Sequence, residues 1–592
     1  MVSLTIAFAG LGLILIASFF ETTKRLHLVE YFALAIAAGL ALVVLLVGGL
    51  TFFDVPLTRF NLSIVLLGLV GASIVRLWGK RSQIQRKQTF FRNQDLTENI
   101  FPLMLFLVLI VLRLLQIRDI FVPNSYDGFL YTSLLQEYLE KSSIPSANIF
   151  QSGFHALALM VHAFWNLTPP EAILLTGQWL SAVCGLSFYV FARRYIHNVY
   201  AAGLSSVVYA CLLLFPTSLI SWGHYSFLMG LVLLPLAILN SMDWITGKSR
   251  CWATLLFVLS LTLTHVGFLL IWSSFVLVYA INRVISIILL RRKARPSGEE
   301  TFLRPLLLIS PALILVLFRA FQPLRYDLLR TNLLSPMLDA ELGVGTQYVF
   351  RLFRTHDSFF IVLGICLILW SLVRKRDQLS VTLYWPLAIW FFTWIQYRVL
   401  RHSLLTYVDL ILLLSLPLAL CIGLLAQQLF PFLVKVDSFD DRPMPRRLTK
   451  SRVSLMLIIC ALVGISYSPL NLDSRRVLFT SEDVLAMQWI NDNTPNNSGF
   501  LIRNITMYNN TLIPSDGGGW IPLLTGRYTI IPQLGELNDI CEFAAAHGVN
   551  YIYFGKQTGN EGFDLRLSDL DVATYNVVYG NPAVEIVSLR CP

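Results

Sequence analysis

The feature that most constrains this chain is a series of continuous apolar blocks, each about 20 residues long. A helix of that length crosses a hydrocarbon core about 30 Å thick. Because lipid offers the backbone no hydrogen-bond partners, only helices and closed barrels span it. The blocks are rich in leucine and do not alternate with polar residues, which indicates helices. Only 14% of the residues are charged, against about a quarter in soluble domains, so a water-soluble fold is excluded.

Basic residues between the blocks predict the direction of each span. Short Lys/Arg clusters are typical of cytoplasmic loops. They follow several blocks, for example at Lys24-Arg25, Arg193-Arg194 and Arg374–Arg376. The first block lacks the basic start and cleavage site of a signal peptide, so we expect a retained span. We expect about 14 spans, near residues 2–20, 28–50, 62–78, 100–117, 171–192, 199–219, 222–240, 252–269, 270–290, 303–320, 356–373, 380–398, 403–424 and 452–468.

The same pattern divides the chain into three parts. Residues 1–99 form an N-terminal membrane extension, residues 100–469 a transmembrane core, and residues 470–592 a C-terminal domain. The loop 118–170 is predicted outside and carries two short apolar-faced helices, Phe129–Leu139 and Gly153–Trp165, which suit the membrane interface. The pair of spans around Thr264–Gly267 is expected to form a tight hairpin with His265 near its outer turn.

The C-terminal part alternates helical and strand-like segments, which predicts a small α/β domain. Span parity places this domain, and both chain termini, outside the cytoplasm. The fold class is therefore an α-helical polytopic membrane protein with a C-terminal α/β soluble domain. Cys541 and Cys591 lie in the domain and could form a disulfide after export. The remaining cysteines lie in apolar blocks and form no CxxC pair, so a structural zinc site is not expected.

The formal charge of +10 does not indicate a nucleic-acid partner. Much of it lies in the short clusters between spans, where positive charge marks the cytoplasmic side. The sequence contains no Walker loop, dinucleotide fingerprint or kinase signature, so no soluble nucleotide site is visible.

Asp127 is the leading candidate for a catalytic base. It lies in the outer loop beside a horizontal helix, where a partly buried carboxylate could accept a proton from a lipid-borne substrate. Tyr131 follows one turn later and would share its face. The alternative is that Asp127 caps the helix Phe129–Leu139. Asp119 is a second acidic candidate, although an ordinary interfacial acid explains it more simply.

Histidines form a second group of candidates. His155 and His162 share one helical face, but no carboxylate at the i+3 or i+4 position completes a metal site, so a hydrogen-bonded cavity-lining histidine is favoured. His224, His265 and His402 reach the outer edge of their spans. Ionisable groups at membrane depth are candidates for function, whereas at the edge they can also lie among headgroups.

A group of arginines breaks the charge rule, because its loops are predicted outside. Guanidinium groups are preferred partners of phosphate, so the cluster suits a lipid-phosphate substrate. Ion pairs with acids of the same loop, anionic headgroups or an error in the topology are the alternatives. The arginines are Arg319, Arg325, Arg330, Arg351, Arg354, Arg398 and Arg401.

The C-terminal domain contains a glycine-rich turn from Asp516 to Arg527 with Trp520 at its centre. An exposed indole face stacks on sugars, and Arg527 could clamp a polar group. A structural turn that docks the domain on the membrane region is the alternative.

Together these residues resemble the GT-C superfamily of membrane glycosyltransferases, specifically uncharacterised prokaryotic members. The resemblance covers roughly residues 100–592 and depends on the order of several short motifs. These are Asp127 in the outer loop, the run Gly153–Leu157, the pair Trp222-Gly223, the pattern Trp489–Pro495, and Gly519-Trp520 followed by Gly526-Arg527.

The resemblance implies an inverting transfer from a polyprenyl-phosphate-linked sugar donor to a glycan, lipid or protein acceptor on the outer face of a prokaryotic plasma membrane. Asp127 would deprotonate the acceptor hydroxyl, and arginines would hold the donor phosphate. Many family members carry paired acids in this loop, whereas Gly128 follows Asp127 here and Asp119 lies further back. The choice of base and a requirement for Mg²⁺ or Mn²⁺ therefore stay open. A lipid-linked glycan transporter and a non-catalytic assembly subunit are the competing classes, although no inverted repeat supports a transporter.

Overall fold

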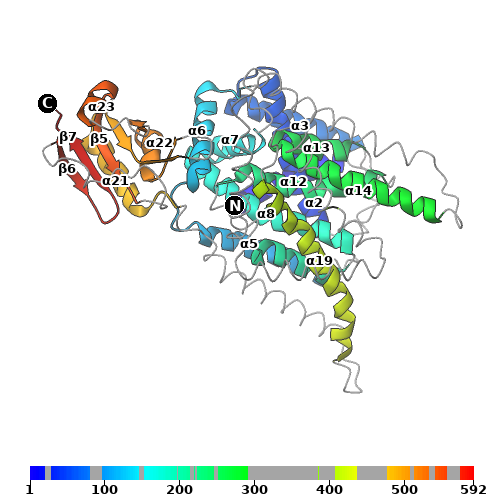
Figure 1. Cartoon of the computed structure of the whole chain (residues 1–592). Helices are drawn as coiled ribbons and strands as arrows, with labels where there is room; N and C mark the ends of the chain where they lie inside the picture. Colours follow the sequence, from blue (N-terminus) through cyan, green and yellow to red (C-terminus); the bar gives the residue numbers. More distant parts are fainter. Residues whose placement is uncertain are drawn as a thin grey trace.

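The computed structural model describes residues 1–19, 28–79, 96–145, 152–196, 198–213, 219, 223–245, 251–290, 385, 407–436, 477–506, 512–532, 540–556 and 574–591. These residues form a bundle of apolar helices and a C-terminal α/β domain that lies beside one end of the bundle (Figure 1).

The N-terminal extension contains α1 (Val2–Phe19), α2 (Leu28–Phe52) and α3 (Arg59–Gly79). Glycines allow α1 and α2 to approach closely, because a Cβ on Gly12 would overlap the Ala35 carbonyl oxygen and one on Gly39 would overlap that of Phe8. Small residues at such crossings are typical of membrane helix pairs. In α3 most apolar side chains point away from the protein.

The bundle is composed of α5 (Leu96–Gln116), α8 (Pro169–Ile196), α9 (Val199–Val207), the π-helix η3 (Val208–Leu212), α12 (Tyr225–Ile245), α13 (Cys251–Thr264), α14 (Val266–Leu290) and α19 (Tyr407–Val436). Helix α8 lies at the centre of the bundle, and its side chains are almost all buried. Helices α5, α9, α12 and α19 contact α8, whereas α13 and α14 pack on α12.

Four helices in the described part are long and apolar enough to cross a membrane, namely Val29–Phe52, Arg59–Arg76, Pro169–Ile196 and Tyr225–Ile245. This finding supports a helical membrane protein. The expected total of about 14 spans stays a prediction, since the blocks 303–320, 356–373 and 452–468, and all of 380–398 except Trp385, are outside the described ranges.

Helix ends that the basic loops assign to one side lie together. At one end of the bundle, Arg194 Nη1 lies 2.6 Å from Asp243 Oδ2, and Arg194 Nε lies 3.6 Å from Glu30 Oε2. This network joins the last turns of α8 and α12 to the first turn of α2. Which membrane face this end meets stays a prediction from the basic loops.

The opposite end of the bundle carries the two short helices of the 118–170 loop. They are α6 (Ser125–Lys141) and α7 (Gly153–Trp165). Gly153 begins α7 against Thr264, the last residue of α13. The chain then reverses at His265, because α14 places Phe268 beside Phe227 at the start of α12 and Trp272 against Ser241 further along α12.

The C-terminal domain is built on a five-stranded sheet of order β4-β1-β5-β7-β6. Strands β1, β4 and β5 are parallel, whereas β7 is antiparallel to β5 and β6. A separate hairpin joins β2 (Asn504–Thr506) to β3 (Leu512–Pro514). The sheet strands are β1 (Gly499–Ile502), β4 (Tyr528–Ile530), β5 (Val549–Phe554), β6 (Tyr575–Gly580) and β7 (Glu585–Leu589).

Helices cover both faces of this sheet. Phe500 and Leu501 point to opposite faces, as alternate strand residues do. Phe500 joins one apolar cluster with α21 (Ser481–Asn493), the 3-10 helix η8 (Gly517–Trp520) and α22 (Ile521–Thr525). Leu501 joins the other with α23 (Ile540–His547). The α/β domain expected from the sequence pattern is therefore present.

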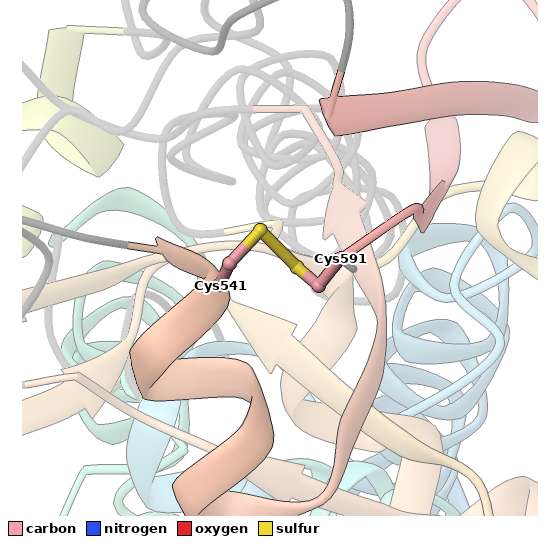
Figure 2. The surroundings of a disulfide bond; sticks show 2 residues. All are labelled: Cys541 and Cys591. Carbon is pink, nitrogen blue, oxygen red and sulfur yellow. A yellow bond between two sulfur atoms is a disulfide. The ribbon is translucent and has the colours of Figure 1, made fainter.

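A disulfide closes this domain. Cys541, in the first turn of α23, is bonded to Cys591, which follows β7, and the two Cα atoms are 5.2 Å apart (Figure 2). The bond ties together residues 50 positions apart in the chain. The pairing that the sequence left open is therefore formed.

Candidate functional site

Asp127 and His224 form a pair at the end of the bundle that carries α6. Asp127 lies in the first turn of α6 and His224 immediately precedes α12, with 3.4 Å between Asp127 Oδ2 and His224 Nδ1. The side chains are 34% and 39% exposed, respectively. Both polar ends are thus accessible to a ligand while being held by helices. The sequence placed both residues at the outer face but did not predict this pair.

The start of α6 differs from the sequence prediction. We expected the helix to begin near Phe129 with Asp127 as a possible cap, but it begins at Ser125, and Asn124 occupies the N-cap position. Asp127 is therefore inside the helix, and the capping interpretation is wrong. The polar first turn, Ser125 to Gly128, carries little of the apolar periodicity that marks a helix in a sequence.

Gly223 allows α12 to meet α6. Its φ is +71°, and a Cβ at this position would lie 2.5 Å from the Gly128 nitrogen and 2.9 Å from the Asn124 carbonyl oxygen. Glycine alone tolerates both the left-handed conformation and the close backbone approach. This contact places His224 next to the first turn of α6, so Gly223 is a determinant of the Asp127–His224 pair.

Tyr131 lies one turn after Asp127, as expected. Its hydroxyl is hydrogen-bonded to that of Ser226, in the first turn of α12, and its ring stacks on His155 with 5.0 Å between the ring centroids. His155 is buried and also meets Tyr138 edge-on. The aromatic packing thus joins α6, α7 and α12 beneath the Asp127–His224 pair. The substrate-binding roles of Tyr131 and His155 stay predictions.

His265 lies at the reversal between α13 and α14. Its Nδ1 accepts a hydrogen bond from the Gly267 nitrogen at 3.2 Å, and its ring meets Phe227 edge-on. Phe227 follows His224 by one turn of α12, so His265 belongs to the same end of the bundle.

Asp119 has a different setting from Asp127. Its Oδ2 accepts a hydrogen bond from Arg118 Nε at 2.8 Å, and both side chains are largely exposed. This arrangement fits an ordinary interfacial acid. Asp127 is the acid that the fold places beside a histidine.

Trp520 is buried against the membrane part of the protein. Its side chain is only 1% exposed, and its ring meets Phe129 of α6 at 5.6 Å and 88°. Phe479 covers the indole from another direction. The geometry matches the alternative of a docking turn, because Trp520 presents no open face to a sugar.

Asp516 and Arg527 are also buried. Asp516 accepts hydrogen bonds from the Gly518 and Gly555 nitrogens, each at 2.9 Å, and burial raises the pKa of Asp516 to about 7. Arg527 donates to the backbone oxygens of Asn491 and Thr494 and so closes the end of α21. A cation at a helix C-terminus is also favoured by the helix dipole. These contacts give both residues a structural role within the domain.

The predicted phosphate-binding arginines lie outside the ranges that the structure describes, as does one of the predicted histidines. They are Arg319, Arg325, Arg330, Arg351, Arg354, Arg398, Arg401 and His402.

Sequence reasoning missed Asn124 and Phe129. Asn124 is buried three residues before Asp127, and within the described structure its side-chain nitrogen has no hydrogen-bond partner. Buried donors are rarely left unpaired, so Asn124 is an unusual residue beside the candidate base. A lone asparagine before a helix resembles an ordinary cap in a sequence, so no signal distinguished it.

The described residues contain no group of three or more His, Cys, Asp or Glu side chains that could hold a metal ion. Asp127 and His224 would supply two ligands at most. Without a further ligand, the Asp127 carboxylate can accept a proton, and His224 can orient the carboxylate.

No protein family and no curated protein matches this sequence. Among solved structures, the arabinofuranosyltransferase AftD from Mycobacteria is similar at a TM-score of 0.43 and 12% sequence identity. The match covers 82% of this chain and 40% of AftD, so the chain spans less than half the length of that enzyme.

Proposed function

We propose that this chain is an inverting membrane glycosyltransferase. It would transfer a sugar from a polyprenyl-phosphate-linked donor to an acceptor hydroxyl at the outer face of the membrane. The observation that carries the proposal is the partly exposed Asp127–His224 pair, held by α6 and α12 at one end of a membrane helix bundle. A transferase acting on a lipid-borne substrate needs its base at this depth, within reach of both lipid and water.

The reaction assigned to the pair is a single displacement. The acceptor oxygen attacks the anomeric carbon of the donor sugar while its proton passes to the Asp127 carboxylate. The bond between that carbon and the donor phosphate breaks, and the polyprenyl phosphate leaves with the bonding electrons. His224 would orient the carboxylate through its Nδ1, and the present 3.4 Å separation is typical of a catalytic contact that tightens when substrate binds.

The C-terminal disulfide supports an outer location for the site. Disulfides persist in oxidising compartments and are rare in the cytosol. Because the domain that contains Cys541–Cys591 packs on α6 through Trp520, the Asp127 end of the bundle shares its compartment. The proposal therefore includes a role in cell-surface glycan assembly, with a glycan, lipid or protein as the acceptor.

The test is sugar transfer by the purified full-length protein in nanodiscs. Polyprenyl-phosphate donors with different radiolabelled sugars are offered with lipid extracts and glycans as acceptors. We expect Asp127→Asn to lower the rate by about 10²–10⁴-fold, as loss of a general base does. Asp119→Asn is the matched control and should retain activity. Full activity in a folded Asp127→Asn variant would remove the base assignment.

A further inference from the structure

We propose that the C-terminal domain positions Asp127, and that Trp520 is the positioning residue through which it acts. The expected effect on transfer kinetics rests on the proposed transferase function. The expected effect on the hydrogen exchange of α6 does not. Trp520 touches no substrate in this account. It would act by fixing the first turn of α6.

Residues on both sides of Asp127 in the sequence contact the C-terminal domain. Phe129 follows Asp127 by two residues and meets the Trp520 ring nearly at a right angle. Val122, before the start of α6, is buried in the same apolar cluster as Phe479, Met487 and Trp520 of the C-terminal domain. The segment that carries the candidate base thus enters the core of another domain at both of its ends.

The turn that holds Trp520 is constrained on the domain side. A Cβ on Gly517 would overlap the Asp483 carboxylate, and one on Gly519 would lie 2.7 Å from the Pro514 side chain. Asp516 fixes the turn further by accepting from Gly518 and Gly555, which ties it to the end of β5. Residues locked in this way give a rigid surface for docking.

The first turn of α6 is held from the other side by the helix bundle. Gly223 packs on Gly128 and Asn124, and Ser226 bonds Tyr131. The turn is therefore clamped between α12 and the C-terminal domain, as the adjacent positions of α6 and α22 in Figure 1 illustrate. Without Trp520, only the α12 contacts hold the first turn of α6 beside His224, so the turn should open more often.

The experiment uses the full-length protein in nanodiscs and four variants. Trp520→Ala removes the contact, and Trp520→Phe keeps a ring against Phe129. Trp489→Ala is the matched control, because Trp489 packs against the same apolar cluster as Trp520 but its ring contacts Tyr579. Phe129→Leu removes the contact from the α6 side, which keeps the test valid if Trp520→Ala unfolds the domain.

Two measurements are made on each variant. Hydrogen exchange of the α6 amides reports local opening, and we expect it to rise about tenfold in Trp520→Ala and Phe129→Leu. Transfer kinetics should show kcat lowered by about a hundredfold, the scale of a misplaced catalytic group, with the donor KM nearly unchanged. Trp520→Phe should restore most of both properties, and Trp489→Ala should leave α6 exchange at the wild-type value.

Each contrary result has a definite meaning. Unchanged α6 exchange in both contact variants overturns the positioning role, whatever the protein's activity. Equal opening of α6 in Trp489→Ala also overturns it, because general loosening of the domain would then explain the effect. If α6 opens but kcat is unchanged while Asp127→Asn is inactive, the domain docks without positioning the base, and the inference is wrong. Absence of transfer in the wild type overturns the proposed function and leaves the exchange data to decide whether Trp520 fixes α6.

Discussion

Replacing Asp516 with asparagine should change how the stability of the C-terminal domain depends on pH. Asp516 is fully buried, and burial is the main cause that raises its pKa from 3.8 to about 7. Hydrogen bonds from the Gly555 and Gly518 nitrogens and the charge of Arg503 oppose this rise, whereas the nearby Asp483 carboxylate adds to it. The Tyr553 hydroxyl donates a hydrogen bond to Asp483.

The sign of the effect follows from the raised pKa. The protonated form is the one that the folded domain favours, so its contribution to stability is complete below about pH 4 and is lost as the pH rises to about 7. One pKa unit corresponds to about 1.4 kcal/mol. A rise of about three units therefore predicts that the unfolding free energy falls by about 4 kcal/mol over this range.

The asparagine variant is uncharged at every pH. It cannot present oxygen to both Gly518 and Gly555, so losing one of these bonds should cost about 1–3 kcal/mol in acid. Above pH 7 the variant avoids burying a charge, and this gain should exceed the cost. The variant is thus expected to be less stable than wild type near pH 4 and more stable near pH 8.

The assay is urea-dependent pulse proteolysis of the full-length protein in nanodiscs, with cleavage in the C-terminal domain as the readout. The unfolding midpoint is measured at several pH values between 4 and 8 for wild type, Asp516→Asn and Glu542→Gln, which changes an exposed carboxyl on α23. A wild-type midpoint that rises with pH in this window would refute the reasoning. An identical pH slope in wild type and Asp516→Asn would refute it as well.

Two further changes test other features of the structure. Cys541→Ser combined with Cys591→Ser should destabilise the C-terminal domain by about 2–4 kcal/mol, the usual effect of opening such a loop. The measurement is a lower urea midpoint. Reductant should have the same effect on wild type, and Cys184→Ser should have none. Gly223→Ala should lower the rate of transfer by at least about tenfold, because a Cβ would push α12 away from α6 and displace the catalytic pair. Gly526→Ala is the control, because Gly526 also has a positive φ but has open space around it. Equal effects of the two changes on transfer would contradict the role given to Gly223.

The sequence predicted the elements of this fold better than their contacts. Apolar block length identified helices such as α2, α8 and α12, and alternating patterns identified the α/β domain. These features depend on local properties that each segment carries by itself. The sequence misplaced the start of α6 because the turn from Ser125 to Gly128 is polar and has no apolar periodicity to indicate a helix. Contacts with residues at the start of α12 stabilise this turn in the folded chain.

The contacts at the candidate site depend on residues far apart in the chain. Nothing local to Asp127 indicates that His224 lies beside it, because Gly223 reveals its positive φ only in the folded chain. Trp520 shows the same limit. A tryptophan in a glycine-rich turn suits both a sugar platform and a docking contact, and only the position of Phe129 distinguishes the two.

Asp127 and Asp516 differ in whether a substrate can reach the carboxyl group. Strongly shifted carboxyl groups are common at functional sites, and Asp516 has the shifted pKa. Both of its oxygens, however, already accept backbone hydrogen bonds, and no substrate reaches a side chain with no exposed surface. Asp127 is one-third exposed, faces a histidine and lies where two helices end at the edge of an apolar bundle. A base must meet its substrate before its pKa matters, so accessibility and partner decide in favour of Asp127, and the buried Asp516 is assigned to the turn that holds Trp520.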